Sequence, residues 1–403
     1  MQEKDQPETR EISSVLSIQQ LEVLFSDLRK RSFGMPLNQN KIDLTELGLS
    51  GLASHTISNL GDPYKEGCYK IQSKAYEREV INYIASLYEL DDDGWGYITS
   101  GDSEGNLFSL YMGREYLERK SRDDIHDGSI KPVLFFSKAA HYSVPKAARI
   151  MGLQYRVVEA DENGEMNYLD LEQAINQYQY RPMLFALNIG STFTGATDDL
   201  QKVNNLLQKY NVSDHFIHCD AALSGMILPF VGKPLDISFE QGLDSIVISG
   251  DKLLGSPIPS AMVVTRKKYT QYIKNDVEVI GSNDITISGS RYGLAAIAIW
   301  YILQETKDSL DEEVRQCLDN AEHLYQLLKE QHYPCFLNEN SITVVFKQPL
   351  SEQFINRYQL AVEDGWAHIV TLQHVTQQQL ALFVDELIES DRETRKNQKV
   401  VKL

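Results

Sequence analysis

The sequence is short of cysteine, of basic residues and of long apolar runs. Its four cysteines, Cys68, Cys219, Cys317 and Cys335, are scattered, so we expect neither a disulfide framework nor a zinc site. Acidic residues outnumber basic ones by 57 to 39, and the net charge of −18 disfavours nucleic acid and anionic lipid as partners. No stretch approaches the roughly 18 apolar residues of a membrane span, and the polar first residues do not resemble a signal peptide. We therefore expect a cytoplasmic protein.

The length of 403 residues suits two or three packed units, and 42% hydrophobic content is enough for a large core. We expect an N-terminal arm over residues 1–60, a large domain over 61–305 and a small C-terminal domain over 306–403. The arm is interpreted as an ordered segment that embraces a partner subunit, with a flexible leader as the alternative.

The middle of the chain alternates apolar strand-like runs with helical segments. PVLFFS, PMLFALNI, HFIHCDAAL and DSIVISGD are rich in β-branched and aromatic residues, and LDLEQAINQYQY and DLQKVNNLLQKY separate several such runs. This pattern predicts an α/β fold, with a mostly parallel sheet covered by helices on both faces. After residue 305 the pattern predicts long helices, strands near SITVVFK and WAHIVTLQ, and a closing helix, which together favour a small α+β unit.

Two candidate site features follow strand-like runs in the first half of the chain. The turn from Ser100 to Asn106 is rich in small residues and precedes a helix, so free N–H groups there can bind an anion, with Ser103 adding a hydroxyl. An ordinary capped helix is the alternative. His141 follows a buried strand, where its ring can stack on a planar cofactor, or can serve only as a structural residue.

Two further candidates are charged residues at the ends of apolar runs. Asp220 follows HFIHC, where a carboxylate needs a cationic partner such as a pyridinium nitrogen, and the small Ala222 leaves room for a ring. A metal site of His215, His218 and Asp220 is the alternative, although that spacing along a strand converges poorly.

Lys252 lies between an apolar strand and a segment broken by glycine and proline. Desolvation at such a place lowers the pKa of a lysine and makes it a Schiff-base nucleophile. A lysine at a strand end is otherwise a surface residue.

Taken in order, these residues resemble the PLP-dependent (pyridoxal 5′-phosphate-dependent) group II amino acid decarboxylases, and most of all the short bacterial histidine decarboxylases. The resemblance covers roughly residues 61–300. It is carried by GDPY, GYITSGDSEGNL, HYSVPKAARI, NIGSTFTGATDDL, HCDAALSGMILPF, DSIVISGDKLLGSPIP and GSNDITISGSR. It implies PLP fold type I, similar to aspartate aminotransferase, with a large mixed sheet and a small C-terminal domain.

The resemblance also implies roles for individual residues. Lys252 would carry PLP, Asp220 would keep the pyridine nitrogen protonated, and His141 and Ala222 would flank the ring. Lys252, His141 and Asp220 would be the catalytic residues. Ser191 and Ser290 fall near the site in the family, whose equivalent of the ISGSR segment commonly comes from a neighbouring subunit, which implies a homodimer with shared sites. The cofactor-binding residues would be Ser100, Gly101, Ser103, His141, Thr192, Asp220, Ala222, Ser249, Lys252 and Ser288.

Three positions depart from the family pattern. Asp251 stands where relatives usually have histidine, and Asp102 stands where they have a second glycine. Both bring a carboxylate toward a phosphate dianion, which predicts weaker PLP binding unless the side chains point away or are bridged. Val279 stands where an aromatic proton donor is expected, which leaves His141 or a water molecule as donor to Cα.

The expected reaction is decarboxylation of an L-amino acid, with L-histidine preferred and serine, aromatic amino acids or diaminobutyrate as other substrates. A PLP-dependent lyase, desulfurase or transaminase of the same fold is a second hypothesis. A catalytically silent, PLP-free dimer is a third, motivated by Asp102 and Asp251.

Overall fold

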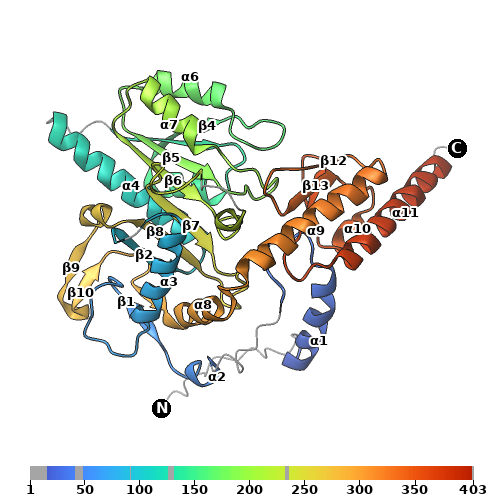
Figure 1. Cartoon of the computed structure of the whole chain (residues 1–403), viewed down its shortest axis with the longest axis horizontal. Coiled ribbons are helices and arrows are strands. Elements are labelled where there is room, and N and C mark those ends of the chain that lie inside the picture. The colour runs from blue at the N-terminus through green and yellow to red at the C-terminus, as the bar shows by residue number, and fades with distance from the viewer. Residues whose placement is uncertain (1–15, 41–48, 91, 126–130, 232–235, 402–403) are drawn as a thin grey trace, which may run out of the picture.

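A computed structural model describes residues 16–40, 49–90, 92–125, 131–231 and 236–401 (Figure 1). Its centre is a seven-stranded sheet in the order β2-β8-β7-β6-β5-β3-β4. The run from β4 to β7 is parallel, and β8 is antiparallel to both of its neighbours. The expected α/β fold with a mixed, mostly parallel sheet is confirmed. The strands are β2 (Gly94–Thr99), β3 (Val133–Ser137), β4 (Gln154–Val158), β5 (Met183–Asn188), β6 (His215–Asp220), β7 (Ser245–Ser249) and β8 (Ala261–Arg266).

Helices cover both faces of this sheet, as its nearly continuous burial requires. One core cluster packs α3 (Lys74–Leu87), α6 (Tyr168–Tyr178), α7 (Leu200–Lys209) and α8 (Gly293–Thr306) on the sheet. A second cluster packs α4 (Asp102–Ile125) and α5 (Ser143–Met151) on the opposite face. Gly105 lets the first turn of α4 lie against β7, because a Cβ at this position would collide with Val247. The start of α4 is thereby fixed close to the carboxyl ends of the central strands.

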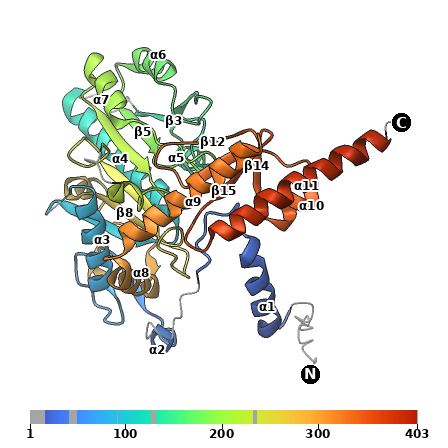
Figure 2. The ribbon, with the colours of Figure 1, turned by 45° about the vertical axis from the view of Figure 1, so that its right-hand side comes forward.

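The C-terminal part forms an antiparallel four-stranded sheet in the order β12-β13-β15-β14. Its strands are β12 (Cys335–Leu337), β13 (Thr343–Lys347), β14 (Ala361–Glu363) and β15 (Trp366–Val370). The long helix α9 (Leu310–Glu330) leads into this sheet, and α10 (Glu352–Arg357) and α11 (Gln377–Val401) pack with it (Figure 2). The two strands and the closing helix expected from the sequence are present. The domain boundaries placed after residues 60 and 305 stay predictions.

The N-terminal segment carries α1 (Ile18–Leu28) and a short helix α2 (Leu49–Leu52). Ser17 and Gln20 form a reciprocal capping box that begins α1, which lies apart from the central sheet (Figure 2). The first 15 residues of the predicted arm and residues 41–48 lie outside the described residues.

Two small ribbons complete the structure. One pairs β1 (Ser58–Leu60) with β11 (Ser290–Tyr292), and the other pairs β9 (Asn275–Val277) with β10 (Ser282–Asp284). A buried ion pair of Arg291 with Glu77, 2.9 Å long, ties the first ribbon to α3. In the part of the chain that the structure describes, no helix is long and apolar enough to cross a membrane.

Candidate active site

A cavity of about 490 Å³ lies where the carboxyl ends of the central strands face the C-terminal sheet. The beginning of α4, the segments after β5, β6 and β7, the segment Gly34–Pro36 and two residues of the C-terminal sheet form its wall. The predicted site residues that line it are Ser100, Gly101, Ser103, His141, Thr192, Asp220, Ala222 and Lys252; Ser191 lines it as well. Residues drawn from more than 150 positions of the sequence therefore meet in one cavity, at the sheet edge where open α/β folds bind ligands.

Asp220 sits at the end of β6 and is only 8% exposed. Its Oδ2 accepts a 2.7 Å hydrogen bond from the amide of Asn106, and its Oδ1 accepts one from the backbone N–H of Ala222. Asn106 is fully buried on α4, about one turn after the helix start. Asp220 is thus held by donors of the protein while it faces the cavity.

The directions of these hydrogen bonds follow from the chemistry of the partners. Because Asn106 donates through Nδ2 to Asp220, its Oδ1 is the acceptor that faces His218 Nε2 at 2.8 Å. His218 must then carry its proton on Nε2 and accept from Ser245 at Nδ1. Burial lowers the pKa of His218 to about 4, which agrees with a neutral ring. His218 therefore orients Asn106 and does not ligate a metal.

The same chain of donors reaches His141. Ser143 accepts from Asn106 Nδ2 at 2.9 Å, so its own hydroxyl proton points to His141 Nδ1, 2.8 Å away. This leaves His141 with its proton on Nε2, the nitrogen available to a ligand in the cavity. Burial lowers the pKa of His141, and the nearby Asp220 opposes this shift. Among the described residues, no group of three or more histidine, cysteine and acidic side chains is arranged to hold a metal.

Lys252 lies in the segment after β7, at the other end of the cavity. Its Nζ is 3.6 Å from Asp102 Oδ2, and the two side chains are only 15% and 20% exposed. Ser249 donates its hydroxyl to the same carboxylate, at 2.8 Å from Oδ1 and 2.7 Å from Oδ2. Ser249 thus does not line the cavity itself, but it contacts Asp102, which does.

Two carboxyl groups crowd this end. Burial raises the pKa of Asp102, whereas Lys252 and the Ser249 hydroxyl lower it. Burial also raises the pKa of Asp251, and the charge of Asp102 raises it further. Asp251 lines a different hollow, beneath α1, so of the two unexpected carboxylates it is Asp102 that enters the cavity wall.

Glu104 fixes the turn that precedes α4. Its Oε2 accepts from the backbone N–H and the hydroxyl of Ser100, and its Oε1 accepts from the backbone N–H of Ser288 at 3.3 Å. Ser288 therefore contacts the cavity through Glu104. The turn is a capped helix start, in which the amides of Glu104 and Gly105 bond to the backbone oxygen of Gly101, and anion binding there stays a prediction.

Sequence reasoning gave no individual role to Asn106, Ser143 or Glu104, and it considered His218 only as a metal ligand. Asn106 and Glu104 lie inside the motif SGDSEGN, where a polar residue on the buried face of an amphipathic helix was the available signal. It also missed His368 of β15, which borders the cavity and has its Nδ1 2.8 Å from the backbone oxygen of Phe193 and its Nε2 3.0 Å from that of Gly34. No local pattern marks that residue.

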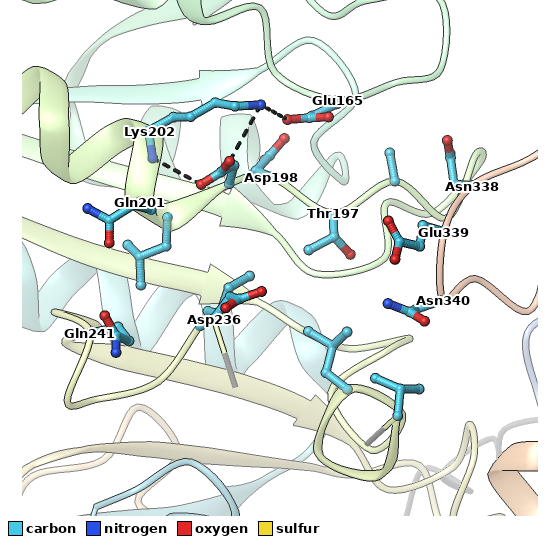
Figure 3. Close-up of a pocket in the computed structure, with 16 residues that line it drawn as sticks. Glu165, Thr197, Asp198, Gln201, Lys202, Asp236, Gln241, Asn338, Glu339 and Asn340 are labelled. Atoms are coloured by element: carbon cyan, nitrogen blue, oxygen red, sulfur yellow. Dashed lines mark hydrogen bonds and ion pairs between the residues drawn. The ribbon is translucent and has the colours of Figure 1, made fainter. Parts of the chain in front are cut away.

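A second cavity, of about 520 Å³, lies beside the loop that follows β5 (Figure 3). Lys202 turns toward Glu165 at 3.2 Å, and none of the predicted site residues lines this space. Asp198, on its wall, accepts from the backbone and side chain of Asn188, which borders the first cavity. Burial raises the pKa of Asp198 to about 7, with these hydrogen bonds opposing the shift. Asp198, on the wall of the second cavity, thus holds Asn188 in the wall of the first cavity.

A buried lysine and a strand-end carboxylate that face one cavity of this sheet define a fold-type-I PLP enzyme. The chain matches the family described as "Pyridoxal-dependent decarboxylase conserved domain" over residues 72–348. It is 39% identical to a histidine decarboxylase of Vibrio campbellii over 83% of this chain and 84% of that protein. It is 38% identical to serine decarboxylase 2 of Oryza sativa subsp. japonica, over 89% of this chain and 74% of the relative.

Solved structures share this fold. The L-methionine decarboxylase of Streptomyces sp. 590 superposes with a TM-score of 0.80 at 22% identity, covering 92% of this chain and 94% of that one. The glutamate decarboxylase of Lactobacillus brevis superposes with a TM-score of 0.78 at 17% identity, over 97% and 96% of the two chains. The chain belongs to the pyridoxal-dependent decarboxylase family. It is a PLP-dependent amino acid carboxy-lyase, as the sequence resemblance implied.

PLP presents three groups to the protein: its aldehyde carbon, its pyridine nitrogen and its phosphate. The cavity suits the first two. Lys252 can hold the aldehyde carbon, and Asp220 has the position and the surrounding donors of a partner for a pyridinium N–H. At the phosphate end, the amides of the α4 start and Ser103 suit an anion, but the carboxylate of Asp102 lies among them.

Proposed function

We propose that the chain decarboxylates L-histidine to histamine and carbon dioxide. The observation that carries this proposal is a hollow of about 910 Å³ that shares His141, Ser191, Thr192 and His368 with the PLP cavity. It continues the site away from Lys252 and offers space for a side chain much larger than that of serine.

The walls of this hollow suit an imidazole. The rings of Phe336 and Trp366, 5.8 Å apart, provide flat apolar contacts. Lys138 pairs with Glu159 at 3.8 Å on the rim, and the carboxylates of Glu363 and Asp364 add a negative potential that attracts a cationic ring and repels an acidic side chain. The histidine decarboxylases among the relatives agree with this choice.

Each residue of the site would have a distinct task. When bound, PLP supplies an electron sink for the pair released as the carboxylate leaves. Lys252 would hold the cofactor and release the product, and Asp220 would keep a proton at the pyridine nitrogen. His141 would pack on the ring, with Ala222 on its other face. Thr192 and Ser191, which line the same cavity as His141, would bind the cofactor hydroxyl or orient the substrate carboxylate.

A proton must then reach Cα. Val279 has no proton to give, and its side chain is 74% exposed. His141 Nε2–H faces the cavity in the tautomer deduced above, so we propose His141 as the donor, with a water molecule as the alternative.

L-serine is the second candidate substrate, because the rice serine decarboxylases are as similar as the bacterial histidine decarboxylases. Aromatic amino acids and diaminobutyrate are further candidates. The test is carbon dioxide release from a panel of L-amino acids with excess PLP. The proposal expects kcat/KM for L-histidine to exceed that for L-serine at least about tenfold, since a hollow built for a ring gains little from a hydroxymethyl group. Equal or faster release from L-serine would overturn it.

The homodimer is also a proposal, as is a cytoplasmic location. On one face of α1, Ile18, Phe25 and Leu28 are 85%, 60% and 42% exposed, and a helix with such a face gains stability by packing on a second copy. Light scattering of the intact protein tests it. A mass of twice 45.9 kDa is expected, and a monomer at micromolar concentration would contradict it.

A further inference from the structure

The carboxylate of Asp102 occupies the place where an anion would be bound at the start of α4. It lies in the first helical turn, where the helix dipole and the unpaired amides favour negative charge. Ser249 has a single hydroxyl proton, and both oxygens of Asp102 lie within 2.8 Å of that hydroxyl. Lys252 Nζ, at 3.6 Å, supplies the cation. The Ser249 hydroxyl and the Lys252 ammonium group are therefore already paired with a side chain of the protein.

A phosphate dianion bound at the start of α4 would compete with Asp102 for the same hydroxyl and the same positive helix end. The phosphate cannot accept the single hydroxyl proton of Ser249 while Asp102 accepts it. Two anions beside the same hydroxyl in a mostly buried site also repel each other strongly. The turn has room for a rearrangement, because Gly101 adopts a φ of +150° and the space where its side chain would be is open.

We propose that Asp102 is a built-in competitor of the cofactor phosphate. In the cofactor-free protein it neutralises Lys252 and holds Ser249, and it must swing away before PLP binds. The contacts of Asp102 with Lys252 and Ser249 set the affinity for PLP, and the hydrogen bonds around Asp220 at the pyridine end do not. The consequence is an enzyme that exchanges its cofactor and responds to the PLP concentration around it. The proposal concerns cofactor loading and does not depend on which amino acid is the substrate.

The test measures the Kd of PLP by equilibrium dialysis for the intact protein and three variants, without substrate. Asp102→Asn removes the charge and keeps the shape, and Asp102→Gly removes the whole side chain. Asp251→Asn is the matched control, because Asp251 is a second partly buried carboxylate beside the same serine but outside the cavity wall. Thermal unfolding of each variant shows that it is folded.

Both Asp102 variants are expected to lower the Kd of PLP about tenfold or more, with a smaller change for Asp251→Asn. Pyridoxal, which lacks the phosphate, should gain much less from Asp102→Asn than PLP does. Unchanged or weaker PLP binding by both folded Asp102 variants would overturn the proposal. So would an equal gain from Asp251→Asn, or an equal gain for pyridoxal. Because no amino acid is present, a wrong substrate assignment leaves every one of these results unchanged.

Discussion

The two ends of the active-site cavity are built in opposite ways. Around Asp220, neutral donors converge on one carboxylate, and Asn106, Ser143 and His218 each have their partners within the protein. Around Lys252, two carboxylates, Asp102 and Asp251, lie near one cation and one hydroxyl, and burial raises the pKa of both. The first end is ready for its ligand before the ligand arrives, and the second must first be rearranged. The difference teaches that one site can be preorganised around its carboxylate, Asp220, while the end that holds the catalytic lysine is not.

The largest effect is expected from Lys252→Ala, which removes the cation of the crowded end. Activity should fall by about a thousandfold or more, because the nucleophile that binds the aldehyde and releases the product is lost. Carbon dioxide release and the visible absorbance of the PLP-loaded protein measure this. Thermal unfolding should change little, and full turnover by the folded variant would contradict the assignment.

The second prediction concerns Asp220→Asn, a substitution at the preorganised end of the cavity. We expect kcat to fall about a hundredfold or more while PLP still binds, since the amide keeps the shape but loses the charge that pairs with a protonated pyridine. The measurements are kcat and the Kd of PLP on the same preparation. A variant with unchanged kcat would remove Asp220 from its role.

Asn106→Leu tests whether the donors behind Asp220 matter. The variant removes the hydrogen-bond partner of the buried atoms Asp220 Oδ2 and His218 Nε2, which costs about 1–3 kcal/mol of stability. It should also lower kcat about tenfold by loosening Asp220. Urea unfolding and kcat check the two effects, and a variant that loses stability alone would limit Asn106 to a structural role.

The smallest expected effect is a loss of folding stability at acidic pH, caused by His218. The pKa of His218 falls from 6.5 to about 4 in the folded protein, so the unfolded chain takes up the proton first. Stability should therefore decrease as the pH falls from about 6.5 to about 4, by up to about 3 kcal/mol from this group. Urea unfolding of the protein and of His218→Gln at pH 7 and pH 4.5 isolates it, because the other groups titrate in both. Parallel losses in the two proteins would contradict a neutral His218.

The parts that could be predicted from the sequence are those encoded locally. Asp220, His141 and Lys252 each follow an apolar strand-like run, and the carboxyl ends of parallel strands meet at one edge, so their convergence was predictable. The α/β fold followed from the alternation of strand and helix patterns in the same way.

The rest depends on contacts between distant segments. Asn106 meets Asp220 across 114 positions because α4 crosses beneath β6, and no spacing encodes that crossing. His368 and Ala361 reach the cavity only because the C-terminal sheet docks on it. The sequence showed that Asp102 was unusual, but its bonds to Ser249 and Lys252 depend on a rotamer chosen by packing.

The most direct test of the central claim is chemical mapping of the cofactor. The purified protein is incubated with PLP, reduced with borohydride and digested, and the peptides are weighed by mass spectrometry. We predict a phosphopyridoxyl group on the peptide that contains Lys252. A modified protein with Lys252 untouched, or the group spread evenly over surface lysines, would contradict the account.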